Sequence, residues 1–439
     1  MEMTGAKILM ECLLEQGVDL VFGYPGGTIL NVYDELYHYR DRITHILTAH
    51  EQGASHAADG YARSTGKVGV CLATSGPGAT NLTTGIATAY MDSSPVVFIT
   101  CNVTQNLIGR DAFQEVDITG IAMPITKCTY LVRDVNNLAD TVREAFAIAR
   151  SGRPGPVLID VPSDIQSEQI VFNYPDAVNL PSYRPTYKGN AKQIKQAVGV
   201  IERASKPILY VGGGAIASGA TEELVKLSTM MQIPVVTTLM GKGAFPASHP
   251  MNLGPVGMHG SKFANLAMTE SDLIIAAGAR FSDRVTGKLS EFAPHAKVIH
   301  IDIAPAEIGK IREAQVPIVG DLKGVVAGIV ATIEKEACAP RTEAWNAQIA
   351  EWRERYPFYD AHITENPDEI VPEIAMQKLS AKLDPHNSVV VTEVGQHQMW
   401  AAQFIDREEP RSFISSGGLG TMGFGFPASI GAAFGRPGA

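Results

Sequence analysis

The first 170 residues alternate short, continuous apolar runs with stretches whose apolar residues recur at helical spacing. The runs are "VDLVFG", "VGVCLA", "VVFITC" and "PVLIDV". Near the amino end, Thr4 is a predicted N-cap, and Ile8, Leu9, Cys12 and Leu13 form one apolar stripe. Short apolar runs predict strands buried on both faces. Strands that alternate with helices predict a parallel sheet with right-handed crossovers.

The same alternation returns after residues 175–190, which are rich in Pro, Asn and Tyr and predict a linker. Later strands are predicted at "ILYV", "LIIAA", "VIHID" and "PIV". A second break spans residues 335–367, where Trp345 and Trp352 are predicted to lie on a short helix. We therefore predict an α/β protein of three doubly wound parallel-sheet domains, the third of them truncated, at residues 1–175, 190–340 and 365–439.

Two distant stretches share one design, "LATSGPGATNLTTGIATAYMD" and "ISSGGLGTMGFGFPASIGAAF". Each has a strand end, a Ser-Gly pair, a glycine turn and then a helix of small residues. Chance similarity between two glycine-rich turns is one interpretation. The other is a duplicated domain, with one copy at each end of the chain.

Composition excludes several classes of protein. The net charge is −10 over 439 residues, and no Lys/Arg cluster predicts a nucleic-acid surface. The five cysteines are scattered without a CxxC pair, which is typical of free thiols in a reducing cytosol. The amino end is not typical of a signal peptide, and no apolar run approaches the roughly 18 residues of a membrane span. We therefore expect a cytoplasmic protein that binds neither nucleic acid nor membrane.

The stretch "TAHEQGASHAADGYAR" places Glu51 at the start of a helix of very small residues. A negative charge at a helix N-terminus is one explanation. The other is a carboxylate held against a ligand. His50 and His56 lie six positions apart, not the four that would place two zinc ligands on one helical face. We predict no metal site here.

Several predicted turns could hold ligands. "TSGPGATN", with Pro77 and Asn81, is either a tight structural turn or a set of N–H groups that meets an anion. "YVGGGAIASG" resembles a dinucleotide-binding turn, although its glycine spacing is irregular. Asp302 ends a later strand, where it either binds a ribose or caps the strand end.

Two further loops are rich in charge. "GARFSDRVTG" carries Arg280, Asp283 and Arg284, which form either a surface ion pair or a carboxylate- or phosphate-binding site. "FQEVDITGIAMPITK" carries Gln114 and Lys127, and solvated loop polarity is the favoured explanation of it taken alone.

Taken together, the motifs are more specific. Along the chain, the motifs occur in the following order: "VFGYPGGTILNVYDEL", "AHEQGASHAADGYAR", "TSGPGATNL", "RDAFQEVD", "GPVLIDVPSDIQ", "GMHG", "GARFSDRVTG", "VGQHQMWAAQF" and "SGGLGTMGFGFPASIGAA". The chain resembles, over essentially its whole length, the catalytic subunit of acetohydroxyacid (acetolactate) synthase, a thiamine diphosphate enzyme. "GARFSDRVTG" with "GMHG" resembles its anabolic, flavin-containing branch. Ser282 departs from that pattern, which commonly has Asp there.

The resemblance implies a pyrimidine-binding domain, a central FAD-binding domain and a diphosphate-binding domain. It implies decarboxylation of pyruvate and transfer of the two-carbon unit to pyruvate or 2-oxobutyrate, in the synthesis of valine, leucine and isoleucine. The flavin would be structural. A homodimer or tetramer and a small regulatory subunit are also implied.

Site residues follow from the same resemblance. Glu51 matches the glutamate that hydrogen-bonds N1′ of the cofactor's aminopyrimidine. Gly26 matches a backbone donor near the reacting centre, and Gln114 matches a polar residue that lines the site. Substrate contacts are expected at Phe113, Lys127 and Arg284. Cofactor contacts are expected at Pro77, Asn81, Gly212, Gly213, Gly214, Met258, His259, Gly278, Arg280, Asp283, Asp302, Asp321, Gln396, His397, Gly420 and Met422.

The family pattern continues beyond Ala439 with the residues that bind Mg²⁺. We therefore expect this chain as written to make no measurable acetolactate. The alternatives are a catalytically silent flavin- or partner-binding fragment, and another pyruvate-type thiamine enzyme such as pyruvate oxidase. Glyoxylate carboligase is disfavoured because it lacks a glutamate at the position of Glu51.

Overall fold

A computed structural model of the protein describes residues 2–358 and 370–439. It divides into two compact units, residues 1–184 with 391–394 and 414–439, and residues 185–390 with 395–413. The predicted helix over Trp345 and Trp352 is present as α15 (Glu343–Arg355), whereas part of the predicted break around it, residues 359–367, lies outside the described residues.

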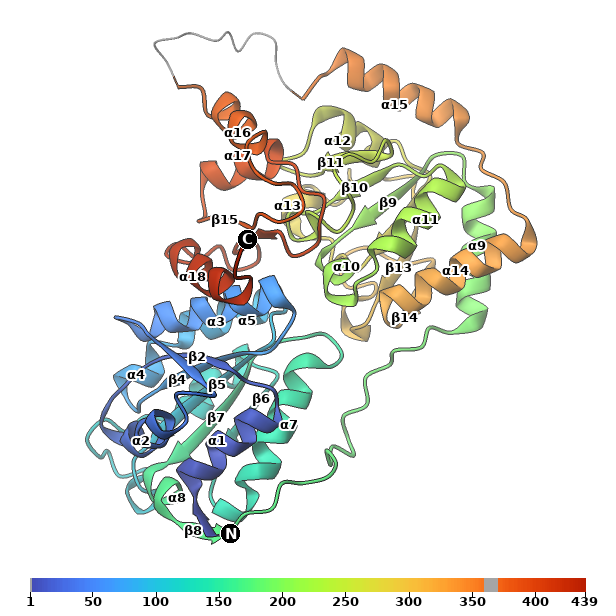
Figure 1. The fold of residues 1–439 in the computed structure, drawn as a ribbon. Coiled ribbons are helices and arrows are strands. Elements are labelled where there is room, and N and C mark those ends of the chain that lie inside the picture. The colour runs from blue at the N-terminus through green and yellow to red at the C-terminus, as the bar shows by residue number, and fades with distance from the viewer. Residues whose placement is uncertain (1, 359–369) are drawn as a thin grey trace. The chain divides into compact units, whose positions relative to one another are not determined.

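The first unit is built on a six-stranded parallel sheet, as predicted (Figure 1). Its strands, in spatial order, are β3 (Thr44–Leu47), β2 (Leu20–Tyr24), β4 (Gly69–Ala73), β5 (Val96–Asn102), β7 (Val157–Pro162) and β6 (Cys128–Leu131). A separate antiparallel pair joins β1 (Glu2–Thr4) to β8 (Gln169–Val171).

Helices cover both faces of this sheet. One layer contains α1 (Gly5–Glu15), α2 (Leu30–His38), α7 (Leu138–Arg150) and α8 (Ser163–Ser167). The other contains α3 (Glu51–Thr65), α4 (Pro77–Thr80), α5 (Thr83–Asp92) and α6 (Ile118–Ala122). Within β4, Val70 and Leu72 pack into the first layer, and Cys71 and Ala73 into the second. Because both faces are covered, the strand reads as a continuous apolar run.

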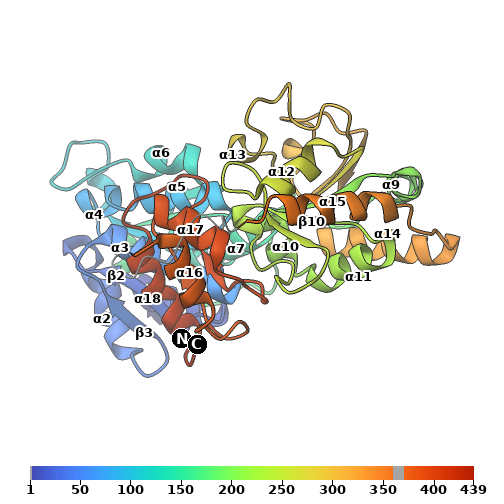
Figure 2. The same cartoon turned by 90° about the horizontal axis from the view of Figure 1, so that it is seen from above.

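The second unit repeats this plan. Its parallel strands, in spatial order, are β11 (Asn252–Pro255), β10 (Val235–Thr237), β9 (Pro207–Val211), β12 (Leu273–Ala277), β13 (Lys297–Asp302) and β14 (Val316–Val319). One face packs against α9 (Ala191–Arg203), α11 (Thr221–Met231) and α14 (Leu322–Glu336), and the other against α12 (Lys262–Thr269) and α15 (Figures 1 and 2).

The remaining elements are short. They are the helices α10 (Gly213–Ser218), α13 (Asp283–Thr286), α16 (Pro372–Ser380), α17 (Gln396–Phe404) and α18 (Gly425–Gly435), and the 3₁₀ turns η1 (Gly27–Ile29), η2 (Gln105–Leu107), η3 (Met123–Ile125), η4 (Val135–Asn137), η5 (Leu239–Gly241) and η6 (Pro305–Glu307). In the described part of the last segment, two strands of two residues each are paired, β15 (Val390–Val391) and β16 (Phe413–Ile414). A small apolar cluster of Ala401, Ala402, Ile405 and Phe413 is buried beside this pair, but a two-stranded sheet is not stable on its own. Accordingly α18 belongs to the first unit and α17 to the second.

Candidate active site

The strand order of the first unit creates one crevice. The chain passes from β2 to β3 on one side and then continues to β4 and β5 on the other. In open parallel sheets a ligand binds where the strand order reverses, beyond the carboxyl ends of the two strands that flank that point. The loops after β2 and β4 lie at that point, and they carry "YPGG" and "TSGPGATN".

Glu51 begins α3 beside these loops, and its side chain is buried at 7% exposure. Its Oε2 accepts a hydrogen bond from Asn81 Nδ2 at 2.9 Å. Among the described residues, Oε1 accepts no hydrogen bond. A side chain at Gly78 would place its Cβ only 3.1 Å from Oε1. The glycine therefore keeps space beside an oriented carboxylate oxygen, which fits a ligand that donates a proton there.

His50 explains why Glu51 need not cap the helix. The His50 side chain is the N-cap of α3, with Nδ1 accepting the Gln52 N–H at 3.1 Å. Glu51 instead uses one oxygen for Asn81 and leaves the other toward Gly78. A carboxylate near a helix N-terminus is still favoured by the helix dipole.

Gly26 is packed tightly against the neighbouring loop. A Cβ at this position would lie 2.4 Å from Cγ2 of Thr74. Thr28 joins the same loops, because its Oγ1 lies 3.0 Å from Oγ1 of Thr74, accepts the Ser75 N–H at 3.1 Å and donates to the Cys101 carbonyl at 2.7 Å. Thr28 thus links the ends of three strands, a role that the sequence analysis missed.

Gln114 lies over the turn after β4. Gly76 has φ +57°, and its Cβ would meet the Gln114 carbonyl oxygen at 2.8 Å, so both its backbone and its surroundings require glycine. Gln114 itself has φ +58°. Glu115 accepts a hydrogen bond from the Gly109 N–H at 2.6 Å, which joins two parts of the loop that carries Gln114. The backbone of Gln114 thus lies against the turn after β4, and its role as a site residue stays a prediction.

Phe113 and Lys127, both predicted substrate residues, have different surroundings. The Phe113 side chain is 86% exposed. The Lys127 ammonium donates to the carbonyls of Ile148 and Ser151, at the end of α7, and to Tyr183 Oη. Burial and then Arg153 lower the pKa of Lys127 to about 8. The structure thus uses Lys127 to cap α7, and its role in a substrate channel stays a prediction.

The small residues of α3 serve close packing against α18, which lies along it in Figure 1. A Cβ on Gly60 would lie 2.1 Å from the Ala428 carbonyl oxygen, and one on Gly431 would lie 1.8 Å from that of Ala57. The helices therefore approach each other with backbone contacts. Residues 414–439 thus belong to the same compact unit as residues 1–184.

The predicted residues of the last segment fall in different units. Gly420 and Met422 lie on an exposed turn of the first unit, with Met422 79% exposed. Gln396 and His397 are exposed at the start of α17 in the second unit. Their shared cofactor role stays a prediction.

The second unit also has its crevice where sequence analysis placed a glycine turn. Strand order reverses between β9 and β12, which are followed by Gly212–Gly214 and by Gly278. Gly278 has φ +61°, and a Cβ there would lie 2.7 Å from the Gly214 Cα. The Gly214 N–H donates to the Gly278 carbonyl at 3.1 Å. These glycines pack the two turns against each other and bring bare backbone to the crevice.

The predicted acids of this unit have structural partners. Asp302 ends β13, where its Oδ1 accepts the Ala304 N–H at 2.8 Å. Asp321 is the N-cap of α14 and accepts the Gly324 N–H at 3.4 Å. Ser282, the departure from the family pattern, caps α13 through the Arg284 N–H at 3.3 Å. Serine and aspartate cap helices equally well, so the departure is conservative.

Met258 and Arg284, far apart in sequence, are brought together. The Met258 N–H donates to the Arg284 carbonyl at 2.8 Å, and Arg284 Nη1 lies 3.8 Å from the Met258 sulfur. The Arg284 side chain is 64% exposed, with Nε 3.5 Å from Asp283 Oδ2. Burial and then Arg284 lower the pKa of His259. Arg280 is half-buried after β12. The guanidinium of Arg284 thus remains accessible to an anion.

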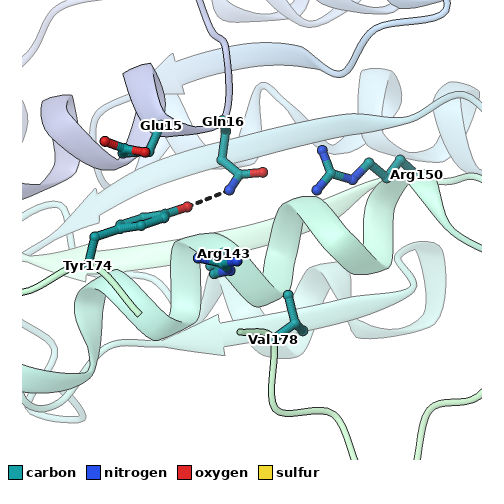
Figure 3. Close-up of a pocket in the computed structure, with 6 residues that line it drawn as sticks. All are labelled: Glu15, Gln16, Arg143, Arg150, Tyr174 and Val178. Atoms are coloured by element: carbon teal, nitrogen blue, oxygen red, sulfur yellow. Dashed lines mark hydrogen bonds between the residues drawn. The ribbon is translucent and has the colours of Figure 1, made fainter. Parts of the chain in front are cut away.

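A pocket of about 270 Å³ lies elsewhere in the first unit (Figure 3). It is lined by Glu15, Gln16, Arg143, Arg150, Tyr174 and Val178, none of them a predicted site residue. Arg143 donates to the carbonyls of Pro175 and Asp176, which fixes the linker to α7.

Across the described residues, no three His, Cys, Asp or Glu side chains lie close enough together to hold a metal ion. The five cysteines are free thiols. No described helix is both long and apolar enough to cross a membrane.

Three models of known protein families match the chain. Residues 3–121 match the N-terminal TPP-binding domain of thiamine pyrophosphate enzymes, residues 194–329 their central domain, and residues 393–439 their C-terminal TPP-binding domain. The chain therefore has the domains of a thiamine pyrophosphate enzyme.

Comparison with individual proteins narrows this class. The chain is 52% identical to the acetolactate synthase of Mycobacterium bovis over 439 residues, all of this chain and 70% of that protein. It is 50% identical to the acetolactate synthase large subunit of Corynebacterium glutamicum, over 99% of this chain and 69% of that protein. A probable large subunit from Methanocaldococcus jannaschii is also 50% identical, over 99% of this chain and 74% of that protein. The chain belongs to the acetolactate synthase large-subunit family, and the predicted resemblance is confirmed.

Proposed function

We propose that the protein condenses two molecules of pyruvate, or pyruvate and 2-oxobutyrate, as the large subunit of a cytoplasmic acetolactate synthase in branched-chain amino acid synthesis. Family membership supports the reaction class. The observation that carries the site assignment is the Glu51 carboxylate. It is buried, oriented through Oε2 by Asn81 and unpartnered at Oε1 among the described residues.

These residues fit the aminopyrimidine of thiamine diphosphate. Glu51 Oε1 is free to share a proton with a ring nitrogen, and Gly78 leaves the room for that ring. The bound cofactor supplies the electron sink for decarboxylation. Glu51 holds the proton at N1′, the Gly26 N–H donates to developing negative charge, and Gln114 borders the same crevice. Tight packing of α3 prevents the acid from moving away.

We further propose that FAD lies across the β9–β12 crevice of the second unit. The bare backbone of Gly212–Gly214 and Gly278 suits close approach of a dinucleotide, and the end of β13 places Asp302 at the same edge of the sheet. The role of the bound FAD would be structural. Arg284 would bind the carboxylate of the acceptor keto acid. We also propose that the protein uses Mg²⁺, for which the described residues supply no cluster of three His, Cys, Asp or Glu side chains.

We also propose a homodimer or tetramer with a small regulatory subunit. The relative from Corynebacterium glutamicum is named a large subunit, which supports a second type of chain.

The experiment is a product assay. The full gene product containing this chain is incubated with pyruvate, thiamine diphosphate, FAD and Mg²⁺, and acetolactate is measured after acid conversion to acetoin. We expect acetolactate without hydrogen peroxide. Hydrogen peroxide with no acetolactate would instead identify a pyruvate oxidase and contradict the proposal.

A further inference from the structure

The exposed turn that carries Gly420 and Met422 is held by residues outside its own motif. It follows β16 and precedes α18 in the first unit. A turn of this kind, rich in glycine, has many conformations available to it unless other groups fix its backbone. The structure shows such groups before and after the apex of the turn, the part that carries Gly420 and Met422.

Asp92 fixes the start of the turn. It ends α5, and its side chain is fully buried. Its Oδ1 accepts the Gly418 N–H at 2.7 Å and its Oδ2 accepts the Gly417 N–H at 3.1 Å. Two adjacent backbone donors on one carboxylate define the direction in which the chain enters the turn.

Arg63 of α3 forms an ion pair with Asp92. Its Nη2 lies 2.9 Å from Asp92 Oδ2, its Nε lies 2.7 Å from Asp59 Oδ1, and its Nη1 donates to the Ser415 carbonyl at 2.8 Å. Burial alone would lower the pKa of Arg63, but Asp59 and Asp92 raise it above its ordinary value. The guanidinium is therefore a permanent bridge between α3, α5 and the turn.

The apex and the end of the turn are fixed too. Thr421 Oγ1 lies 2.7 Å from Thr88 Oγ1 on α5. Glu393 accepts the Gly423 N–H at 2.8 Å and the Gly425 N–H at 2.5 Å. Gly420 and Met422 are thus exposed between fixed points.

We propose that Asp92 is a positioning residue for thiamine diphosphate, because it preforms the backbone from which Gly420 and Met422 meet the cofactor. This inference rests on the proposed function and on the predicted cofactor contacts of Gly420 and Met422. A preformed surface binds more tightly, since less conformational freedom is lost on binding.

The test is Asp92→Asn in the full gene product loaded with FAD. Asparagine replaces one acceptor oxygen with an N–H donor, which must face either a glycine N–H or Arg63. We expect the thiamine diphosphate Kd, measured by calorimetry, to rise at least tenfold. Amide hydrogen exchange in residues 417–424 should become faster. FAD content, a property of the other unit, should not change. Asp164→Asn, which loses contacts only to Gln105, is the matched control and should bind normally.

Thr88→Val provides a second variant that introduces no unpaired charge, in case Asp92→Asn fails to fold. It should raise the Kd several-fold. An unchanged Kd and unchanged exchange in folded Asp92→Asn or Thr88→Val would overturn the inference. Failure of the unsubstituted protein to bind thiamine diphosphate would contradict the proposed function, while the exchange data would still decide whether Asp92 fixes the turn.

Discussion

Single polar residues decide how the crevice of the first unit is arranged. Glu51, Asn81 and Thr28 each join loops from different strands. Glu51 and Asn81 were both candidates from the sequence, because Glu51 precedes a run of small residues and Asn81 lies in the "TSGPGATN" turn. Thr28 had no sequence signal, since its partners lie 46 and 73 positions away.

Lys127 is predicted to stabilise the fold as a cap of α7. Lys127→Met removes three hydrogen bonds at the end of α7 and should lower the free energy of unfolding by about 1–3 kcal/mol. Urea denaturation measures this change. Unchanged stability together with a raised KM for pyruvate would contradict the structural role and favour the substrate channel.

Asp160 is predicted to make the stability of the protein depend on pH. Its carboxylate accepts hydrogen bonds from Thr100 Oγ1 and Asn102 Nδ2, both at 2.7 Å, yet burial raises its pKa to about 6 from 3.8. The folded state therefore binds more protons than the unfolded state between about pH 4 and 6. The contribution of Asp160 protonation to the free energy of unfolding is complete below about pH 4 and is lost as the pH rises through about 6.

Asp160→Asn should remove this dependence. A shift of that size corresponds to roughly 3 kcal/mol, which the unsubstituted protein loses across the window and the variant does not. Unfolding free energies at pH 4, 5, 6 and 7 test the difference. Parallel profiles for the two proteins would contradict the assignment.

At the scale of elements, the packing of α3 on α18 is the most demanding contact. Gly60→Ala places a Cβ 2.1 Å from the Ala428 carbonyl oxygen, a clash with backbone that side-chain motion cannot relieve. We expect a loss of about 1–3 kcal/mol in stability, measured by thermal or urea unfolding.

Gly53→Ala is the matched control on the same helix. No atom lies within 4 Å of its Cβ position, so alanine's higher helix propensity should make it neutral or stabilising by up to about 1 kcal/mol. Equal effects of the two substitutions would show that the α3–α18 contact is not as close as described.

Elements were predicted well where the apolar pattern is local. The runs that became β4, β5 and β7 are buried on both faces, so apolar residues fill most of their positions and the strands are evident. The polar exceptions, Thr100, Asn102 and Asp160, are joined by hydrogen bonds. The roles of Asp302 and Asp321 stayed open, because a strand-end cap and a ribose ligand need the same residue type in the same place. The Arg63–Asp92 pair was missed because its partners lie on separate helices.

At the scale of the molecule, each unit uses one sheet in the same way. In both, the strand order reverses beside the strand that carries a glycine turn, so backbone N–H groups and a crevice occur together. The described residues of the predicted third segment form a sheet of two short strands and contribute elements to each unit. The sequence pattern identified its motifs but could not show that division, which depends on contacts between distant segments.

The proposed function requires that Glu51 activate the cofactor through the proton it shares with N1′. The most direct measurement is the rate at which the C2 proton of bound thiamine diphosphate exchanges with D₂O, followed by NMR, in the unsubstituted protein and in Glu51→Gln. We predict exchange slower by on the order of 10²–10⁴-fold in the variant, with FAD content unchanged. Equal exchange rates in the two proteins would contradict the account.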